Sequence, residues 1–147
     1  MKIELYDNLY KIFILKLDSL DDKNYLIKYI KDAVFKLQHL LSLTGFYKAK
    51  LYPKEKIGLF IELIKVDEVS FSGSLDLRVY VIYDEDIYYK TCNYDIIKDC
   101  NNVGYIDDNF YCIVDNNFDN ILSKVEFGNF IFGEDVKNIV KKIVKLW

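Results

Sequence analysis

The sequence predicts an α+β fold, a mostly antiparallel sheet with two long amphipathic helices, at about 22–43 and 134–147, packed on one face. Both stretches repeat apolar residues with a helical period. The remainder contains runs of strand length that are separated by short polar turns. Only one Pro and six Gly occur in 147 residues, as in a chain built mostly of regular elements. With 52% apolar residues, the chain can build a packed core, which excludes global disorder.

The N-terminal part predicts two strands and a helix. The strands are joined by a turn at Asp7-Asn8. The helix follows either Asp21 or Asp22, each of which can cap it, and it ends before Gly45. The apolar residues of this helix share one face: Leu26, Ile30, Ala33, Val34, Leu37, Leu40 and Leu41.

A hairpin with strands over Phe46–Tyr52 and Ile57–Val66 follows the helix. After it, Ser70 to Ser74 form the one small and flexible stretch of the chain. The length fits a single domain over 1–147, in which two structural halves could meet near 69–74.

The C-terminal half predicts shorter elements between acidic turns. In order, these are a strand over 75–83, a strand over 87–91, a short helix over 94–99, a hairpin over 104–114, a strand over 127–132 and the helix over 134–147.

Charge is distributed unevenly along the chain, which carries a net charge of −3. Residues 1–66 contain 12 Lys and eight acidic residues, whereas residues 84–120 contain nine acidic residues and two Lys. The chain is therefore not basic, and the usual electrostatic signature of direct nucleic-acid binding is missing.

Tyrosines lie among the acidic turns of the middle segment, and seven of the 13 fall between residues 80 and 111. Tyr side chains are enriched at protein interfaces, and acidic groups beside them would attract a basic partner. If the two acidic turns point the same way, their carboxylates form one rim. We therefore expect partner contacts from Tyr83, Asp84, Glu85, Asp86, Tyr88, Tyr105, Asp107 and Asp108. The alternative is a Tyr-rich sheet with solvated turns.

The stretch from Asp115 to Glu126 matches much of the EF-hand calcium loop. Asp115, Asn117, Asp119 and Glu126 occupy the ligand positions, and Asn120 stands where Gly is usual. Because the preceding residues predict a strand instead of the entering helix, a polar turn leading into a short helix is favoured over a calcium site.

Signals for catalysis or cofactor binding are weak. The only histidine, His39, lies on the outer face of the predicted helix, and neither G-x-S-x-G nor a Gly-rich phosphate loop occurs. The three cysteines include no C-x-x-C pair, and we expect them to be buried thiols. No cofactor is expected, and an enzyme of unrecognised type is the minority alternative.

Together these features predict a non-catalytic protein-binding protein of the cytoplasm, acting as an inhibitor, immunity protein or adaptor. The expected partner is another protein with a basic surface, such as a nucleic-acid-binding groove. Direct contact with nucleic acid or a membrane is not expected, because the Lys-rich helix near the C-terminus is more typical of a solvated helix face. A calcium-binding domain that uses residues 115–126 is the second alternative.

Overall fold

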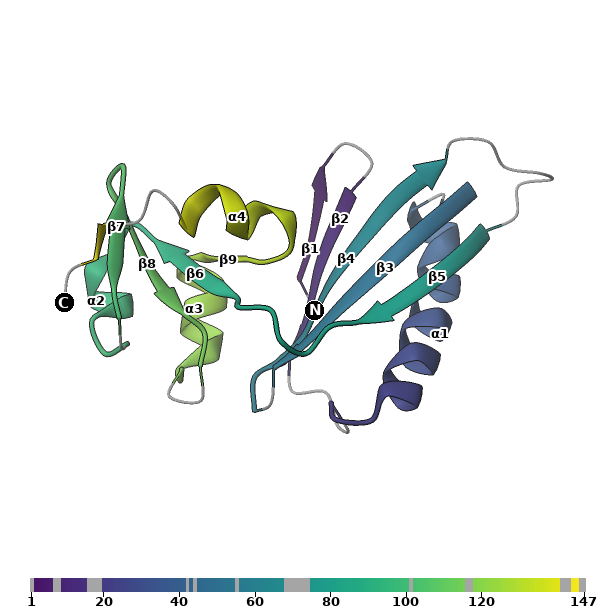
Figure 1. The fold of residues 1–147 in the computed structure, drawn as a ribbon, viewed down its shortest axis with the longest axis horizontal. Helices are drawn as coiled ribbons and strands as arrows, with labels where there is room; N and C mark the ends of the chain where they lie inside the picture. Colours follow the sequence, from purple (N-terminus) through teal and green to yellow (C-terminus); the bar gives the residue numbers. More distant parts are fainter. Residues whose placement is uncertain are drawn as a thin grey trace. The chain divides into compact units, whose positions relative to one another are not determined.

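The structure is a computed structural model. It describes residues 2–6, 9–15, 20–41, 43, 45–54, 56–67, 75–100, 102–115, 118–140 and 144–145. The chain divides into two compact units, Met1–Tyr83 (unit 1) and Asp84–Trp147 (unit 2) (Figure 1). The segment 69–74, where two halves were expected to meet, lies outside the described residues.

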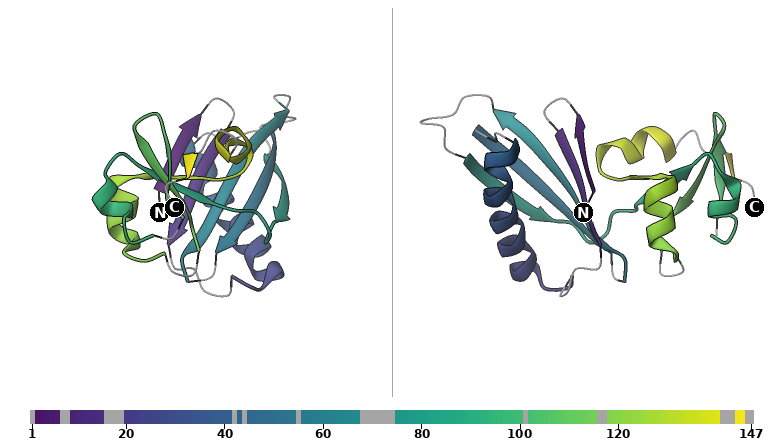
Figure 2. Two further views of the ribbon diagram at one scale, coloured as in Figure 1. Left: turned by 60° about the vertical axis from the view of Figure 1, so that its left-hand side comes forward. Right: turned by 180° about the vertical axis from the view of Figure 1, so that it is seen from behind.

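The described part of unit 1 is a five-stranded sheet with one helix. Its elements are β1 (Lys2–Tyr6), β2 (Leu9–Leu15), α1 (Lys23–Leu41), β3 (Gly45–Lys54), β4 (Gly58–Asp67) and β5 (Leu75–Val81). The strand order is β1-β2-β4-β3-β5; β3 and β5 are parallel, and the other neighbours are antiparallel. Both views of Figure 2 show α1 along one face of this sheet.

Helix α1 begins and ends as its sequence indicates. The Tyr25 backbone N–H donates to the Asp22 carboxylate at 3.1 Å, which caps the first turn. After the last turn, the Leu43 N–H donates to the Gln38 carbonyl, and Gly45 follows with φ of 101°. The core between helix and sheet includes Leu26, Ile30, Val34, Leu51, Leu59, Ile61 and Leu63, all of them buried.

The sheet face opposite this core carries a row of alternating charges. Register places Glu4 opposite Lys11, Lys11 opposite Glu62, and Glu62 opposite Lys50. Lys11 is 4% exposed and Glu62 is 1% exposed, and the Tyr52 hydroxyl donates to Glu62 Oε1 at 2.7 Å. Opposite charges on neighbouring strands stabilise the pairing, so these buried groups compensate one another.

In its described residues, unit 2 is a second five-stranded sheet, fully antiparallel, with three short helices. Its elements are β6 (Tyr88–Thr91), α2 (Tyr94–Ile97), β7 (Gly104–Ile106), β8 (Asn109–Ile113), α3 (Ile121–Phe127), β9 (Asn129–Ile131), α4 (Glu134–Val140) and β10 (Val144–Lys145). The strand order is β10-β7-β8-β6-β9.

The core of unit 2 is aromatic. Tyr89 is fully buried and packs against Phe118 and Phe130, with ring centroids 5.5 and 5.4 Å away. Its hydroxyl donates to the Lys124 carbonyl at 2.6 Å, which links β6 to α3. The buried phenol therefore has a partner for its polar end, as a buried Tyr requires.

The α+β class is confirmed, but the prediction of two long helices on one face of a single sheet was wrong. Helix α1 has 19 residues, whereas α4 has seven and belongs to the other unit. Residues 144–145 pair with β7 as β10 instead of continuing the helix. The physical reason is that the β-branched Val144 suits a strand, and the edge of β7 away from β8 offers it backbone hydrogen-bonding groups.

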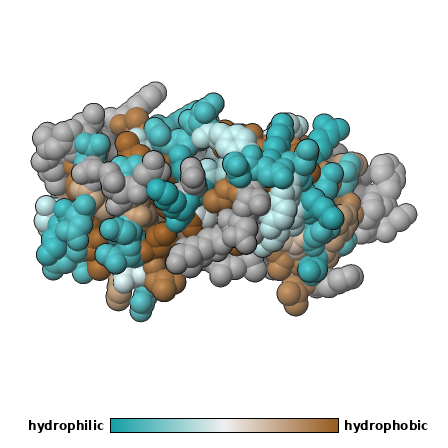
Figure 3. Space-filling model, turned by 90° about the horizontal axis from the view of Figure 1, so that it is seen from below, coloured by the Kyte–Doolittle hydropathy of each residue, from teal (hydrophilic) through white to brown (hydrophobic). Residues whose placement is uncertain are grey.

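None of the helices in the described ranges is both long and apolar enough to cross a membrane. Large apolar side chains are nevertheless exposed in both units, among them Phe35, Leu40, Leu122 and Phe127. In the face drawn in Figure 3, hydrophobic and hydrophilic residues lie side by side.

Candidate functional site

Three aromatic side chains of unit 2 form a partly exposed group, which we call the aromatic cluster: Tyr94, Tyr105 and Phe110. Tyr105 and Phe110 are direct partners across β7 and β8, with ring centroids 5.6 Å apart. Tyr94, the first residue of α2, lies 5.2 Å from the Phe110 ring and is 47% exposed. The other two rings are half-buried. The cluster thus presents partly exposed aromatic area on the β7–β8 hairpin and at the start of α2.

Helix α2 begins at a side-chain cap and contacts this hairpin through the rings of Tyr94 and Phe110. The Asn93 side chain accepts a hydrogen bond from the Asp95 backbone N–H at 3.0 Å, which begins the helix at Tyr94. The Asn93 N–H in turn donates to the Thr91 hydroxyl at 3.2 Å, at the end of β6. These bonds fix the backbone position of Tyr94, from which its ring extends.

Two carboxylates border the cluster in the two-residue turn between β7 and β8, which we call the acidic turn. Asp107 and Asp108 are exposed and have φ of 45° and 67°, so both lie in the left-handed region. A turn of this kind favours Asn-Gly. Asp108 Oδ1 accepts from the Tyr105 hydroxyl at 3.0 Å, which ties the turn to the aromatic cluster. The charge of Asp107 also contributes, after burial, to a raised pKa of Tyr111.

The second acidic stretch, Asp84 to Asp86, lies elsewhere in unit 2. All three of its carboxylates are exposed and precede β6, and Tyr88 at the start of that strand is half-buried. Burial raises the pKa of Tyr88, with a smaller contribution from the charge of Asp86. Tyr83 belongs to unit 1, where its hydroxyl donates to the Asp21 carbonyl at 3.4 Å.

Strand register separates the two acidic stretches. Tyr88 pairs with Ile113, and Thr91 pairs with Phe110, because β6 and β8 are antiparallel. The 84–86 stretch therefore lies at the C-terminal end of β8, and the acidic turn lies at the N-terminal end. The condition for a single acidic rim, two turns at the same end of the sheet, is therefore not met.

The loop expected as an alternative calcium site is entered from a strand, β8, as the sequence indicated. Asp115 is half-buried, Asp119 and Glu126 are exposed, and Asn117 lies outside the described residues. The buried Lys124 ammonium donates to the Asp119 carbonyl and lies 4.7 Å from the Phe118 ring centroid. Among the described residues, no group of three or more His, Cys, Asp or Glu side chains is placed to hold a metal ion.

The cysteines were expected to be buried, but only Cys112 is. Cys92 is exposed and Cys100 is half-buried. A hydrogen bond between the Cys112 and Cys100 thiols lowers the pKa of Cys100 and raises that of Cys112, and burial adds to the rise. His39 lies on α1 in unit 1, and its side chain is outside the described residues.

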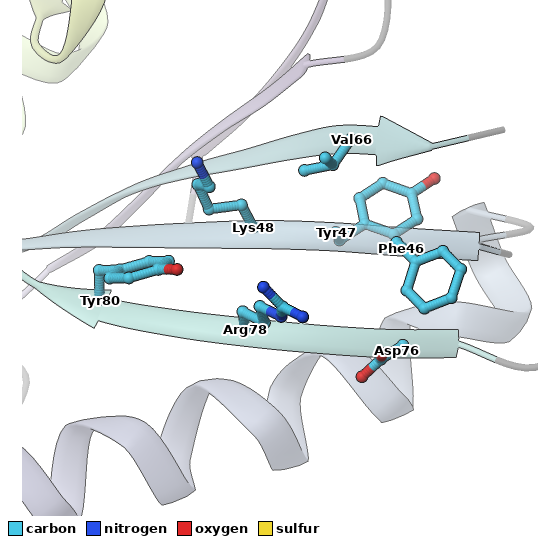
Figure 4. Close-up of a pocket in the computed structure, with 7 residues that line it drawn as sticks. All are labelled: Phe46, Tyr47, Lys48, Val66, Asp76, Arg78 and Tyr80. Carbon is cyan, nitrogen blue, oxygen red and sulfur yellow. The ribbon is translucent and has the colours of Figure 1, made fainter.

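The structure also contains a groove that was not predicted from the sequence. It lies on the sheet of unit 1, has a volume of about 350 Å³, and is lined by Phe46, Tyr47, Lys48, Val66, Asp76, Arg78 and Tyr80 (Figure 4). These residues come from three strands, so their proximity depends on pairings that local sequence does not fix. The only available signal was the alternation of Asp76, Arg78 and Tyr80 on one face of β5.

Comparison of the chain with protein-family models, with curated proteins and with solved structures gave no match.

Proposed function

We propose that this chain is a non-catalytic protein-binding protein of the cytoplasm, an inhibitor, immunity protein or adaptor. It engages a basic protein surface through the aromatic cluster and the acidic turn of unit 2. The observation that carries the proposal is the bond from Tyr105 to Asp108, which holds a carboxylate beside three partly exposed rings.

The chemistry of this surface suits a protein partner with Lys or Arg side chains. Aromatic rings bury large areas on binding and lose little conformational freedom. The adjacent carboxylates would pair with cations and accelerate encounter. A nucleic-acid-binding groove is one such basic surface, and the chain would compete there with phosphate.

The aromatic part of the proposal is tested by capturing proteins from the native host on the immobilised chain and measuring the affinity of the purified partner. Tyr94→Ala should weaken binding by about 30-fold or more, because aromatic anchors at interfaces contribute about 2 kcal/mol or more. The matched control is Tyr83→Ala, which removes a similarly exposed Tyr, 44% against 47%, outside the cluster.

Equal affinities for wild type and both variants would overturn the assignment of the cluster. A loss confined to Tyr83→Ala would move the interface to unit 1. Circular dichroism of both variants checks that the fold is retained.

A further inference from the structure

The groove of unit 1 opens on the sheet face opposite α1 and is shaped by a β-bulge. Register shifts between Phe46 and Tyr47, so that Val66 of β4 has no direct partner on β3. Bulges of this kind bend a strand and redirect its side chains. Val66, which is 62% exposed, lines the groove at this point, together with the nearly buried Tyr47. One wall of the groove is therefore formed at the β-bulge, where Val66 has no direct partner on β3.

Two cations lie next to each other in the groove. Lys48 of β3 and Arg78 of β5 are direct partners in the parallel pairing of these strands. Like charges on neighbouring strands are destabilising unless a counter-charge compensates them. The carboxylate that lines the groove belongs to Asp76, and within the described part of unit 1 it forms no ion pair with either cation. An anion bound between Lys48 and Arg78 would relieve this repulsion.

Aromatic rings flank the two cations. Figure 4 shows Lys48 and Arg78 between the Tyr80 ring on one side and the Phe46 ring on the other. The Lys48 ammonium lies 5.7 Å from the Tyr80 ring centroid. Both aromatic residues are more than a third exposed, so a ligand in the groove can reach them from solvent. Burial and, to a smaller extent, the neighbouring Tyr10 raise the pKa of Tyr47, so the Tyr47 hydroxyl stays protonated.

We propose that this groove binds a nucleoside monophosphate. Its phosphate would lie between Lys48 and Arg78, and its base would stack on Tyr80 or Phe46. A phosphate monoester carries nearly two negative charges at pH 7, which matches two cations, and the Arg guanidinium can bond phosphate in a bidentate manner. The volume of about 350 Å³ lies at the small end of the range for ligand sites.

A single nucleotide fits this face better than a strand of nucleic acid. Beyond the groove, the charge row on the same sheet alternates in sign, with Glu62 between Lys50 and Lys11. A continuous basic track that could follow a phosphate backbone is therefore interrupted. The proposal concerns unit 1 and does not depend on the protein-binding surface of unit 2.

Isothermal titration of the full chain tests the proposal with adenosine and guanosine monophosphates, the corresponding nucleosides and inorganic phosphate. We expect saturable binding of a monophosphate, and binding of its nucleoside and of phosphate alone that is weaker by about tenfold or more. Arg78→Gln and Tyr80→Leu should each weaken binding of the monophosphate by a similar factor. The control is Lys28→Gln, which removes an exposed cation from α1.

The proposal is overturned if no monophosphate binds saturably at millimolar concentration, or if Lys28→Gln weakens binding as much as Arg78→Gln does. It is also overturned if a short single-stranded oligonucleotide binds more tightly with a salt dependence of several phosphates, because the site would then belong to a polymer. Cooperative urea unfolding of each variant confirms that the groove residues were changed in a folded protein.

Discussion

The acidic turn should become more stable when it receives the residues that its backbone prefers. Asp107 and Asp108 both adopt positive φ, a conformation in which Gly has no side-chain penalty and Asn is well tolerated. The variant Asp107→Asn/Asp108→Gly also removes two adjacent negative charges from the hairpin. We therefore expect it to raise the free energy of unfolding of unit 2.

The magnitude follows from three contributions. Relief of the left-handed conformation at Asp108 contributes about 1 kcal/mol, and relief of like-charge repulsion adds about 0.3 kcal/mol. Loss of the exposed hydrogen bond from Tyr105 to Asp108 costs about 0.5 kcal/mol. The net gain is about 0.8 kcal/mol, which corresponds to a rise in melting temperature of about 3–6 °C for a unit of this size.

The assay is thermal and urea unfolding followed by far-UV circular dichroism. Asp84→Asn/Asp86→Gly is the matched control, because it makes the same chemical changes where φ is not positive. Gly at such a position increases the entropy of the unfolded chain, so this control should gain nothing. A loss of stability in the Asp107→Asn/Asp108→Gly variant, or an equal gain in the control, would show that positive φ at Asp107 and Asp108 does not limit the stability of the turn.

Three further predictions concern the cores of the two units. Glu62→Gln should lower the unfolding free energy of unit 1 by about 2 kcal/mol, because it removes one of the two carboxylates opposite the buried Lys11 and the charged acceptor of the Tyr52 hydroxyl, while Glu4 remains; urea unfolding with a change under about 1 kcal/mol would contradict this. Gly128→Ala should cost unit 2 about 2 kcal/mol or more, since the added Cβ would lie within 3.0 Å of the Tyr89 hydroxyl oxygen and of a backbone carbonyl oxygen. Wild-type thermal stability in that variant would show that the contact relaxes freely. Burial raises the pKa of Tyr89 from 10.0 to about 12, so the stability that the protonated hydroxyl contributes is present below pH 10 and is lost as pH rises to about 12. Over this pH range the melting temperature of Tyr89→Phe should fall less steeply than that of the wild type. Equal slopes for the two proteins would argue against this.

Elements whose signals are local were predictable. Helix α1 was expected over 22–43 and spans Lys23–Leu41, with Asp22 as the cap, because apolar period and capping both act within a few residues. Even in α1 the apolar stripe extends beyond the buried face of the helix, because Leu40 continues the stripe but is 80% exposed. The apolar period shows which face of a helix can be buried, whereas the neighbouring strands determine how much of that face is buried.

Features that depend on strand pairing were not predictable. Within the stretch 134–147, expected as one helix, the described residues form α4 (Glu134–Val140) and β10, which pairs with β7 about 40 residues earlier in the chain. Each acidic stretch was correctly expected on the surface, but the antiparallel register of β6 and β8 sets them at opposite ends. The groove depends on the parallel pairing of β3 with β5, which no local pattern indicated.

We propose that the acidic turn, next to the aromatic cluster, guides a basic protein partner. The most direct test is the association rate of the captured partner, measured from low to high salt. Asp107→Asn/Asp108→Asn, which keeps residues suited to positive φ, should slow association by about tenfold at low salt, and the difference should shrink near 1 M salt, where the Debye length is about 3 Å. Neutralising the 84–86 stretch (Asp84→Asn, Glu85→Gln, Asp86→Asn) removes one more charge and should change the rate less. Equal rates and equal salt dependence for wild type and the acidic-turn variant would contradict the claim.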